Sequence, residues 1–103
     1  MKYYFFKLLP PRPTFMQDMT PAELQLMQEH AGYWRGQLER GYAVGFGPVA
    51  DPAGGFGMGL LELPDEVDPA SLTAGDPVIK ADVGFRAEVF PMPRAVVRAA
   101  PRA

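Results

Sequence analysis

The sequence predicts one α+β domain with the element order β-α-β-β-α-β. Three observations predict it. A strongly patterned helix follows an apolar strand, two further strands flank a glycine-rich turn, and a short proline-started helix precedes the last strand. At 103 residues the chain has room for a single domain.

The first strand is predicted over residues 2–9, which are dense in aromatic and aliphatic side chains. Pro10, Pro11 and Pro13 end this strand, because proline cannot continue the ladder of backbone hydrogen bonds. We expect them to open a loop that reaches about Met19.

The long helix has a clear beginning and end. Thr20 is a predicted N-cap, Pro21 occupies the first helical position, and Glu23 completes a capping box. Gly41 is expected to end the helix. Apolar residues recur between these limits at spacings of three and four, which predicts one buried stripe: Leu24, Met27, Ala31, Trp34 and Leu38.

The second half of the chain supplies the remaining elements. Strands are predicted over 42–49, 56–63 and 82–90, with a turn over 51–55 and a short helix from Asp68 to about Ala74. Gly75-Asp76-Pro77 is expected to end that helix, and residues 91–103 to form a tail. The complete order is that of a ferredoxin-like fold with a four-stranded antiparallel sheet.

The first strand also predicts a partner. Tyr3 and Phe5 point to one face of the sheet, whereas Tyr4, Phe6 and Leu8 point to the other. Two helices can cover only one face, so we expect a homodimer packed sheet against sheet. The alternative is a monomer whose proline-rich segments fold over the open face.

Composition narrows the classes of function. The net charge is −2, and basic residues cluster only sparsely in the tail, which argues against a nucleic-acid partner. The absence of cysteine excludes disulfides and thiolate metal sites and fits a reducing compartment. The apolar start contains Lys2 and Lys7 and is too short for a signal sequence or a membrane span. We therefore expect a cytoplasmic protein that binds neither nucleic acid nor membrane.

His30 is the first candidate for chemistry, because it is the only histidine and the natural proton carrier near neutral pH. It lies roughly 70° to the side of the predicted stripe, where a side chain can reach a cleft. The alternative is a boundary histidine bonded to a backbone carbonyl.

Asp51 is the candidate partner of His30. A turn after the second strand could carry this carboxylate to the edge of the sheet, where it would orient the imidazole as a general base. Gly47 and Pro48 would shape the turn. The alternative is an ordinary turn aspartate bonded to its own backbone.

Four segments together resemble the YciI-like (YCII-related) family: residues 29–34, 38–41, 47–55 and 75–77. The resemblance implies a dimeric α+β barrel of ferredoxin-like subunits, with a His-Asp active site in a cleft beside the sheet. Carried over, that pair falls on His30 and Asp51. One member of the family eliminates chloride from a hydroxylated aromatic ring, so the resemblance also implies that such a site can act as a lyase.

The other candidates are weaker. Arg12 and Phe15 could form a lid with an anion-binding end, and Tyr33 and Trp34 could line a pocket, although Trp34 also fits the core. No metal and no cofactor is expected. Three functions remain open: a lyase- or isomerase-type enzyme that acts on an unknown small molecule by acid/base catalysis, a non-catalytic metabolite-binding module and, last, RNA binding.

Overall fold

The computed structural model describes residues 1–98. The elements along the chain are β1 (Lys2–Leu9), α1 (Phe15–Asp18), α2 (Pro21–Glu39), β2 (Ala43–Val49), β3 (Phe56–Leu63), α3 (Pro69–Ala74), α4 (Pro77–Lys80) and β4 (Arg86–Met92). The first and third predicted strands coincide with β1 and β3, and the second begins one residue later than predicted.

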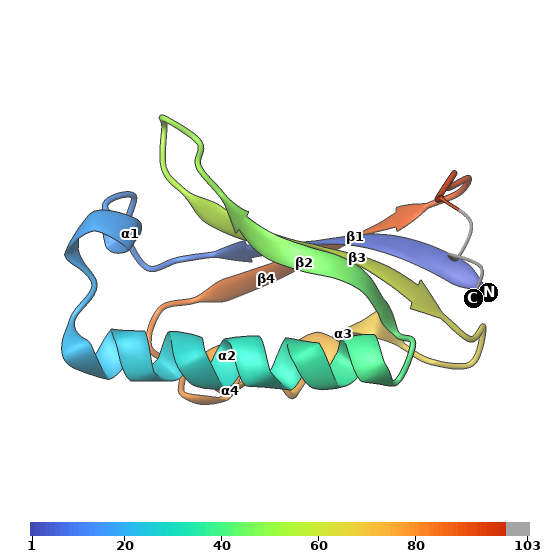
Figure 1. The fold of residues 1–103 in the computed structure, drawn as a ribbon, viewed down its shortest axis with the longest axis horizontal. Coiled ribbons are helices and arrows are strands. Elements are labelled where there is room, and N and C mark those ends of the chain that lie inside the picture. The colour runs from blue at the N-terminus through green and yellow to red at the C-terminus, as the bar shows by residue number, and fades with distance from the viewer. Residues whose placement is uncertain (99–103) are drawn as a thin grey trace.

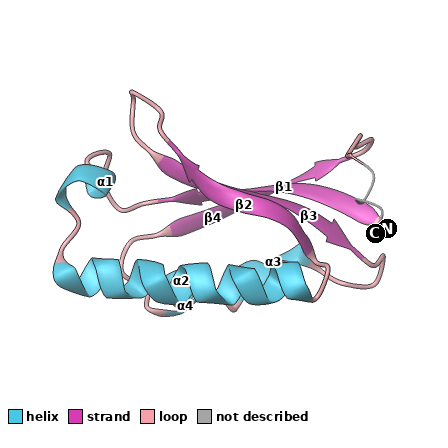
Figure 2. Cartoon of the chain, viewed as in Figure 1, coloured by secondary structure: helices cyan, strands magenta, loops and turns pink. Residues whose placement is uncertain are grey.

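The four strands form one antiparallel sheet in the order β2-β3-β1-β4. β1 therefore lies between β3 and β4, with Phe5 opposite Leu60 on one side and Phe90 on the other. Helices α2, α3 and α4 all lie on one face of the sheet (Figure 1, Figure 2). The predicted ferredoxin-like α+β fold is confirmed.

The N-terminus of α2 has the predicted capping box. The hydroxyl of Thr20 accepts a hydrogen bond from the backbone N–H of Glu23, and the Glu23 carboxylate accepts one from the Thr20 N–H. The helix ends at Glu39, and Arg40 is its C-cap. Gly41 comes next with a φ of 80°, a conformation that glycine adopts without steric strain.

The buried face of α2 is rotated from the predicted stripe. Leu24 and Leu38, at the two ends of that stripe, are 49% and 39% exposed. Trp34 and Gln37 are buried instead, and His30 precedes Trp34 by one helical turn on the same face. The prediction that His30 lies beside the packed face is therefore wrong: it lies within it.

The segment before the last strand also differs from the prediction. Asp82 and Gly84 have φ values of 53° and 100°, so residues 82–85 form a turn and β4 begins only at Arg86. β4 then continues to Met92 as an edge strand, where Pro91 is tolerated. The predicted tail therefore loses its first two residues to β4, and its last five, 99–103, lie outside the described residues.

The core lies between the sheet and the helices. Its fully buried side chains come from β1, α2, β3 and α4: Leu8, Trp34, Leu61, Leu63 and Val78. No helix within residues 1–98 combines the length and the apolar character needed to span a membrane. The opposite face of the sheet carries Phe5 and Phe90 and has no helix over it (Figure 1).

Candidate active site

His30 forms a hydrogen-bonded pair with Asp76. The Nδ1 atom of His30 lies 2.7 Å from Oδ2 of Asp76, and the two residues are 46 positions apart in the chain. The aspartate is fully buried, whereas the histidine side chain keeps 12% of its surface exposed. The pair thus joins a buried carboxylate to an imidazole that still reaches solvent.

Asp76 holds its position through two further donors. The indole N–H of Trp34 donates to the same Oδ2 atom at 2.7 Å, and the backbone N–H of Val78 donates to Oδ1 at 3.1 Å. The second bond makes Asp76 the N-cap of α4, with Pro77 at the first helical position. Two N–H donors thus hold the two oxygens of Asp76, and Nδ1 of His30 shares Oδ2 with the indole of Trp34.

A close approach between α2 and the α3–α4 connection brings this aspartate to the histidine. A Cβ atom added to Gly75 would lie 2.6 Å from the hydroxyl oxygen of Tyr33, so a larger residue there would require the Tyr33 side chain to move. The Tyr33 hydroxyl donates to the carbonyl of Leu72 at 2.6 Å and ties α2 to α3. Burial, together with the negative charge of Asp76, raises the pKa of Tyr33.

Asp51 does not pair with His30. Its side chain is exposed and accepts a hydrogen bond from the backbone N–H of Ala53 at 2.9 Å, the turn geometry that was the alternative reading. The β2–β3 connection that carries it extends away from α2 (Figure 1). The predicted pairing with Asp51 is corrected to Asp76, because the hairpin tip points outward while the α3–α4 connection packs on the helix.

A cavity of about 360 Å³ lies beside His30, between α2 and the sheet. Six aromatic side chains line it: Phe6, Phe15, Trp34, Phe46, Phe56 and Phe85. Four methionines add flexible, polarisable surface: Met16, Met19, Met27 and Met58. The imidazole of His30 is the titratable group in this lining.

The predicted site residues divide into two groups. Phe15, Trp34, Gly47 and Pro48 line the cavity together with His30. Tyr33 and Arg12 do not line it. Tyr33 is turned toward α3 by its bond to Leu72, and Arg12 is engaged by acidic residues outside the cavity.

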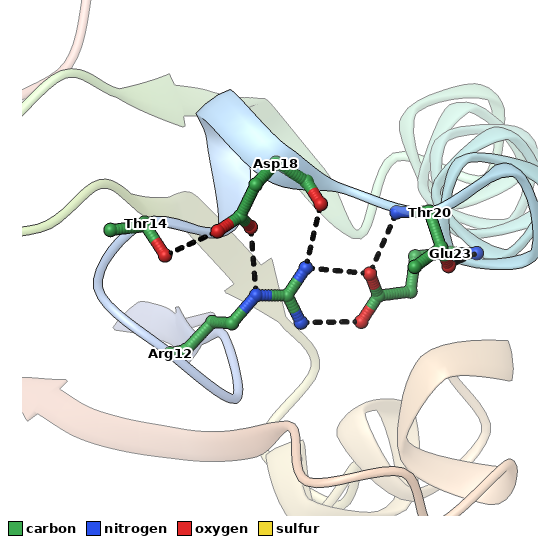
Figure 3. Close-up of polar contacts among 5 residues, drawn as sticks. All are labelled: Arg12, Thr14, Asp18, Thr20 and Glu23. Atoms are coloured by element: carbon green, nitrogen blue, oxygen red, sulfur yellow. Dashed lines mark hydrogen bonds and ion pairs between the residues drawn. The ribbon is translucent and has the colours of Figure 1, made fainter.

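Arg12 is held by two carboxylates (Figure 3). Its Nη1 and Nη2 atoms donate to both oxygens of Glu23 at 2.8 Å, and its Nε donates to Asp18 at 2.7 Å. Hydrogen bonds from Arg12 lower the pKa of Glu23 to about 2, while Glu23 and Asp18 raise the pKa of Arg12. The expected anion-binding end of a lid is therefore already occupied by the chain's own carboxylates.

Residues 10–19, which we call the strap, cover part of the cavity. Phe15 is buried and packs edge-to-face on Phe85, with 5.2 Å between ring centroids. Met16 lies against Gly55, where an added Cβ atom would be 2.4 Å from the methionine sulfur. The Arg12 cluster ties the strap to the first turn of α2 and so keeps these two side chains over the cavity.

The hydrogen bonds define what the imidazole can do. A carboxylate only accepts hydrogen bonds, so opposite the carboxylate form of Asp76 the shared hydrogen lies on Nδ1 of His30. In the neutral ring Nε2 then has a free lone pair, and no hydrogen-bond partner of Nε2 occurs among residues 1–98. Within the same residues, no three His, Asp or Glu side chains are grouped closely enough to hold a metal ion.

Sequence reasoning missed Asp76 as the partner, although one signal was present. Asp before Pro is a frequent start of a helix, so Asp76-Pro77 could have been interpreted as an N-cap rather than as the end of α3. The four methionines of the cavity gave no comparable signal, because they come from three separate parts of the chain: the strap, α2 and β3.

Comparison with known proteins adds little. No protein-family model matches the chain, and no curated protein matches it. One similar solved structure is a formyltetrahydrofolate deformylase from Pseudomonas putida KT2440, which is 16% identical with a TM-score of 0.45. The similarity covers 86% of this chain and 28% of that chain, so this chain spans under a third of its length. A likeness at this level carries no argument about function.

Proposed function

We propose that this protein is a cofactor-independent enzyme of the lyase or isomerase type, in which His30 is the general base and then the general acid. The observation that carries the proposal is the 2.7 Å bond between Nδ1 of His30 and buried Asp76 beside an apolar cavity. Asp76 acts as a positioning residue, because it fixes the tautomer of the ring without facing the cavity.

The proposed chemistry begins with proton transfer. Nε2 of His30 takes a proton from an acidic C–H or O–H group of the bound molecule, and the Asp76 carboxylate stabilises the imidazolium that forms. The electron pair left on the substrate either expels a leaving group or moves to an adjacent carbonyl. The imidazolium then returns its proton to the leaving group or to a second carbon, which completes elimination or isomerisation.

The alternative is a non-catalytic module that binds a metabolite in the same cavity. It is supported by the predominantly apolar lining, in which His30 could simply hydrogen-bond a ligand. The two functions differ in one respect. An enzyme must move a proton through Nε2, whereas a binder only has to hold the ligand.

Hydrogen exchange distinguishes them without knowledge of the natural reaction. A panel of aromatic ketones and phenols is incubated with the protein in heavy water. Deuterium incorporated at carbon is followed by mass spectrometry after the hydroxyl groups have been returned to ordinary hydrogen in light water. We expect incorporation with the wild type and with Asp51→Ala, the matched control, and loss of it with His30→Ala. Ligands that bind with no incorporation in any protein would favour the binding module, and incorporation by His30→Ala would exclude His30 as the base.

We also propose that two copies pack through the open face of their sheets. Phe5 and Phe90 lie side by side there with ring centroids 6.2 Å apart, and Phe90 is 47% exposed. Leu60 continues the apolar surface on β3 opposite Phe5. Covering these side chains removes apolar area from water, which stabilises association by roughly 25 cal/mol per Å².

Sedimentation at several concentrations tests the dimer. We expect a dimer for the wild type and a monomer for Phe90→Lys, which places a charge at the centre of the proposed interface. Val83→Lys serves as the control, because Val83 is equally exposed but lies in the turn before β4. A wild type that sediments as a monomer at every concentration would refute the proposal.

Membership of the YciI-like family remains part of the proposal. It is supported by the ferredoxin-like order of elements and by a histidine-aspartate pair beside the sheet, with Asp76 in the place that the resemblance gave to Asp51. A cytoplasmic location, which the absence of cysteine favours, is proposed with it.

A further inference from the structure

We propose that the cavity selects an uncharged, largely apolar molecule that carries one weakly acidic hydroxyl or N–H group, which donates to Nε2 of His30. This inference rests on the proposed function, since it concerns the same site, and it names the class of substrate.

The lining favours an apolar ligand. The side chains around the cavity are aromatic, aliphatic or thioether groups apart from His30. Trp34 brings one polar hydrogen to the same region, but its indole N–H is already donated to Asp76. A polar group of the ligand placed anywhere except at His30 would lose its water without gaining a partner.

The placement of charge disfavours an anion. The carboxylate of Asp76 lies directly behind the imidazole, with Oδ2 only 2.7 Å from Nδ1. No lysine or arginine within the described chain lines the cavity to offset it. A ligand carboxylate or phosphate would therefore lose its hydration next to a buried negative charge, which is unfavourable.

Two basic side chains touch lining residues from outside the cavity. The guanidinium of Arg12 lies 5.4 Å from the Phe15 ring centroid, but its three nitrogens all donate to Asp18 or Glu23. The ammonium of Lys7 lies 4.5 Å from the centroid of Phe56. Neither group belongs to the cavity lining, so neither is in place to pair with an anion bound beside His30.

The free lone pair on Nε2 sets the last requirement. The site offers this acceptor to the ligand, and leaving an acceptor unpaired when water is displaced is unfavourable. A hydroxyl or N–H group of the ligand supplies the missing donor. A general base at Nε2 would remove this same hydrogen. Binding of the ligand and proton transfer from it would therefore involve the same contact, between Nε2 and the ligand's hydroxyl or N–H group.

Calorimetry with three probes that share the naphthalene ring tests the inference: β-naphthol, naphthalene and β-naphthoate, each titrated into the full chain at neutral pH. We expect β-naphthol to bind about tenfold more tightly than naphthalene, the effect of one hydrogen bond. β-Naphthoate should bind at least about tenfold more weakly than β-naphthol. In His30→Leu the preference for naphthol over naphthalene should disappear, whereas Asp51→Ala should retain it.

Each other result would overturn the inference. Binding of β-naphthoate at least as tight as that of β-naphthol would show that an anion is accepted, and a naphthol preference that survives in His30→Leu would place the acceptor elsewhere. Absence of binding by all three probes would exclude the ligand class. Because these measurements need no turnover, the selectivity can hold even if deuterium exchange shows that the protein is not an enzyme, and it can fail while exchange is observed.

Discussion

Replacing Asp76 with alanine should destabilise the protein far more than the same change at Asp51. The substitution leaves the indole N–H of Trp34 and the backbone N–H of Val78 buried without an acceptor. Each buried donor left unpaired costs about 1–3 kcal/mol, which places the expected loss at about 2–6 kcal/mol. His30 adds less to this loss, because its partly exposed ring can turn to water.

Asp51→Ala is the matched control, with the same change of side chain. The carboxylate of Asp51 is exposed and holds one turn hydrogen bond to Ala53, so water can replace it. We expect a loss below about 1 kcal/mol. The contrast between the two variants follows from burial and the number of donors alone.

Urea denaturation followed by fluorescence measures both losses, because Trp34 is the only tryptophan and is buried in the native state. Should Asp76→Ala fail to fold, Asp76→Asn keeps the shape and one acceptor oxygen and should give an intermediate loss. Similar free energies of unfolding for Asp51→Ala and Asp76→Ala would refute the reasoning, because they would mean that Asp76 does not hold buried donors.

The remaining predictions concern the strap and the glycines. Hydrogen bonds from Arg12 lower the pKa of Glu23 from 4.5 to about 2. The stabilisation by the ionised Glu23 carboxylate is therefore complete above pH 4.5 and is lost as the pH falls through about 2. The unfolding free energies of the wild type and Glu23→Gln should differ at about pH 6 and converge at about pH 2. Gly84→Ala should lower the unfolding free energy by about 1–3 kcal/mol, since Gly84 has a φ of 100° and an added Cβ would lie 2.9 Å from Pro11. Gly32→Ala should raise the unfolding free energy by about 0.5–1 kcal/mol in thermal denaturation, because Gly32 is helical with open space around it. A change of the opposite sign at either glycine would contradict the backbone conformation described for it.

Much of the fold could be predicted because its signals are local. The capping box at Thr20 and Glu23 fixed the start of α2, and the aromatic run of β1 together with the proline cluster after it fixed the first strand. The last strand was misplaced, because the alternating residues before it also fit a strand. The left-handed conformations of Asp82 and Gly84, which break that pattern, cannot be read from composition.

The site was predicted only in part for a similar reason. His30 stood out because it is the only histidine, and four other candidates line the same cavity: Phe15, Trp34, Gly47 and Pro48. The partner of His30 depends on which connection packs on α2: the β2–β3 connection, which carries Asp51, or the α3–α4 connection, which carries Asp76. The α3–α4 connection does so, and Gly75 lies against Tyr33 there, a tertiary contact between distant parts of the chain.

The most direct test of the His30–Asp76 pair is a long-range proton–nitrogen NMR spectrum of the imidazole, recorded at a pH where the ring is neutral. Because the chain has one histidine, the two ring nitrogens can be assigned without ambiguity. We predict a hydrogen on Nδ1 and none on Nε2, with this tautomer lost in Asp76→Ala and retained in Asp51→Ala. A wild-type ring with its hydrogen on Nε2 would contradict the account.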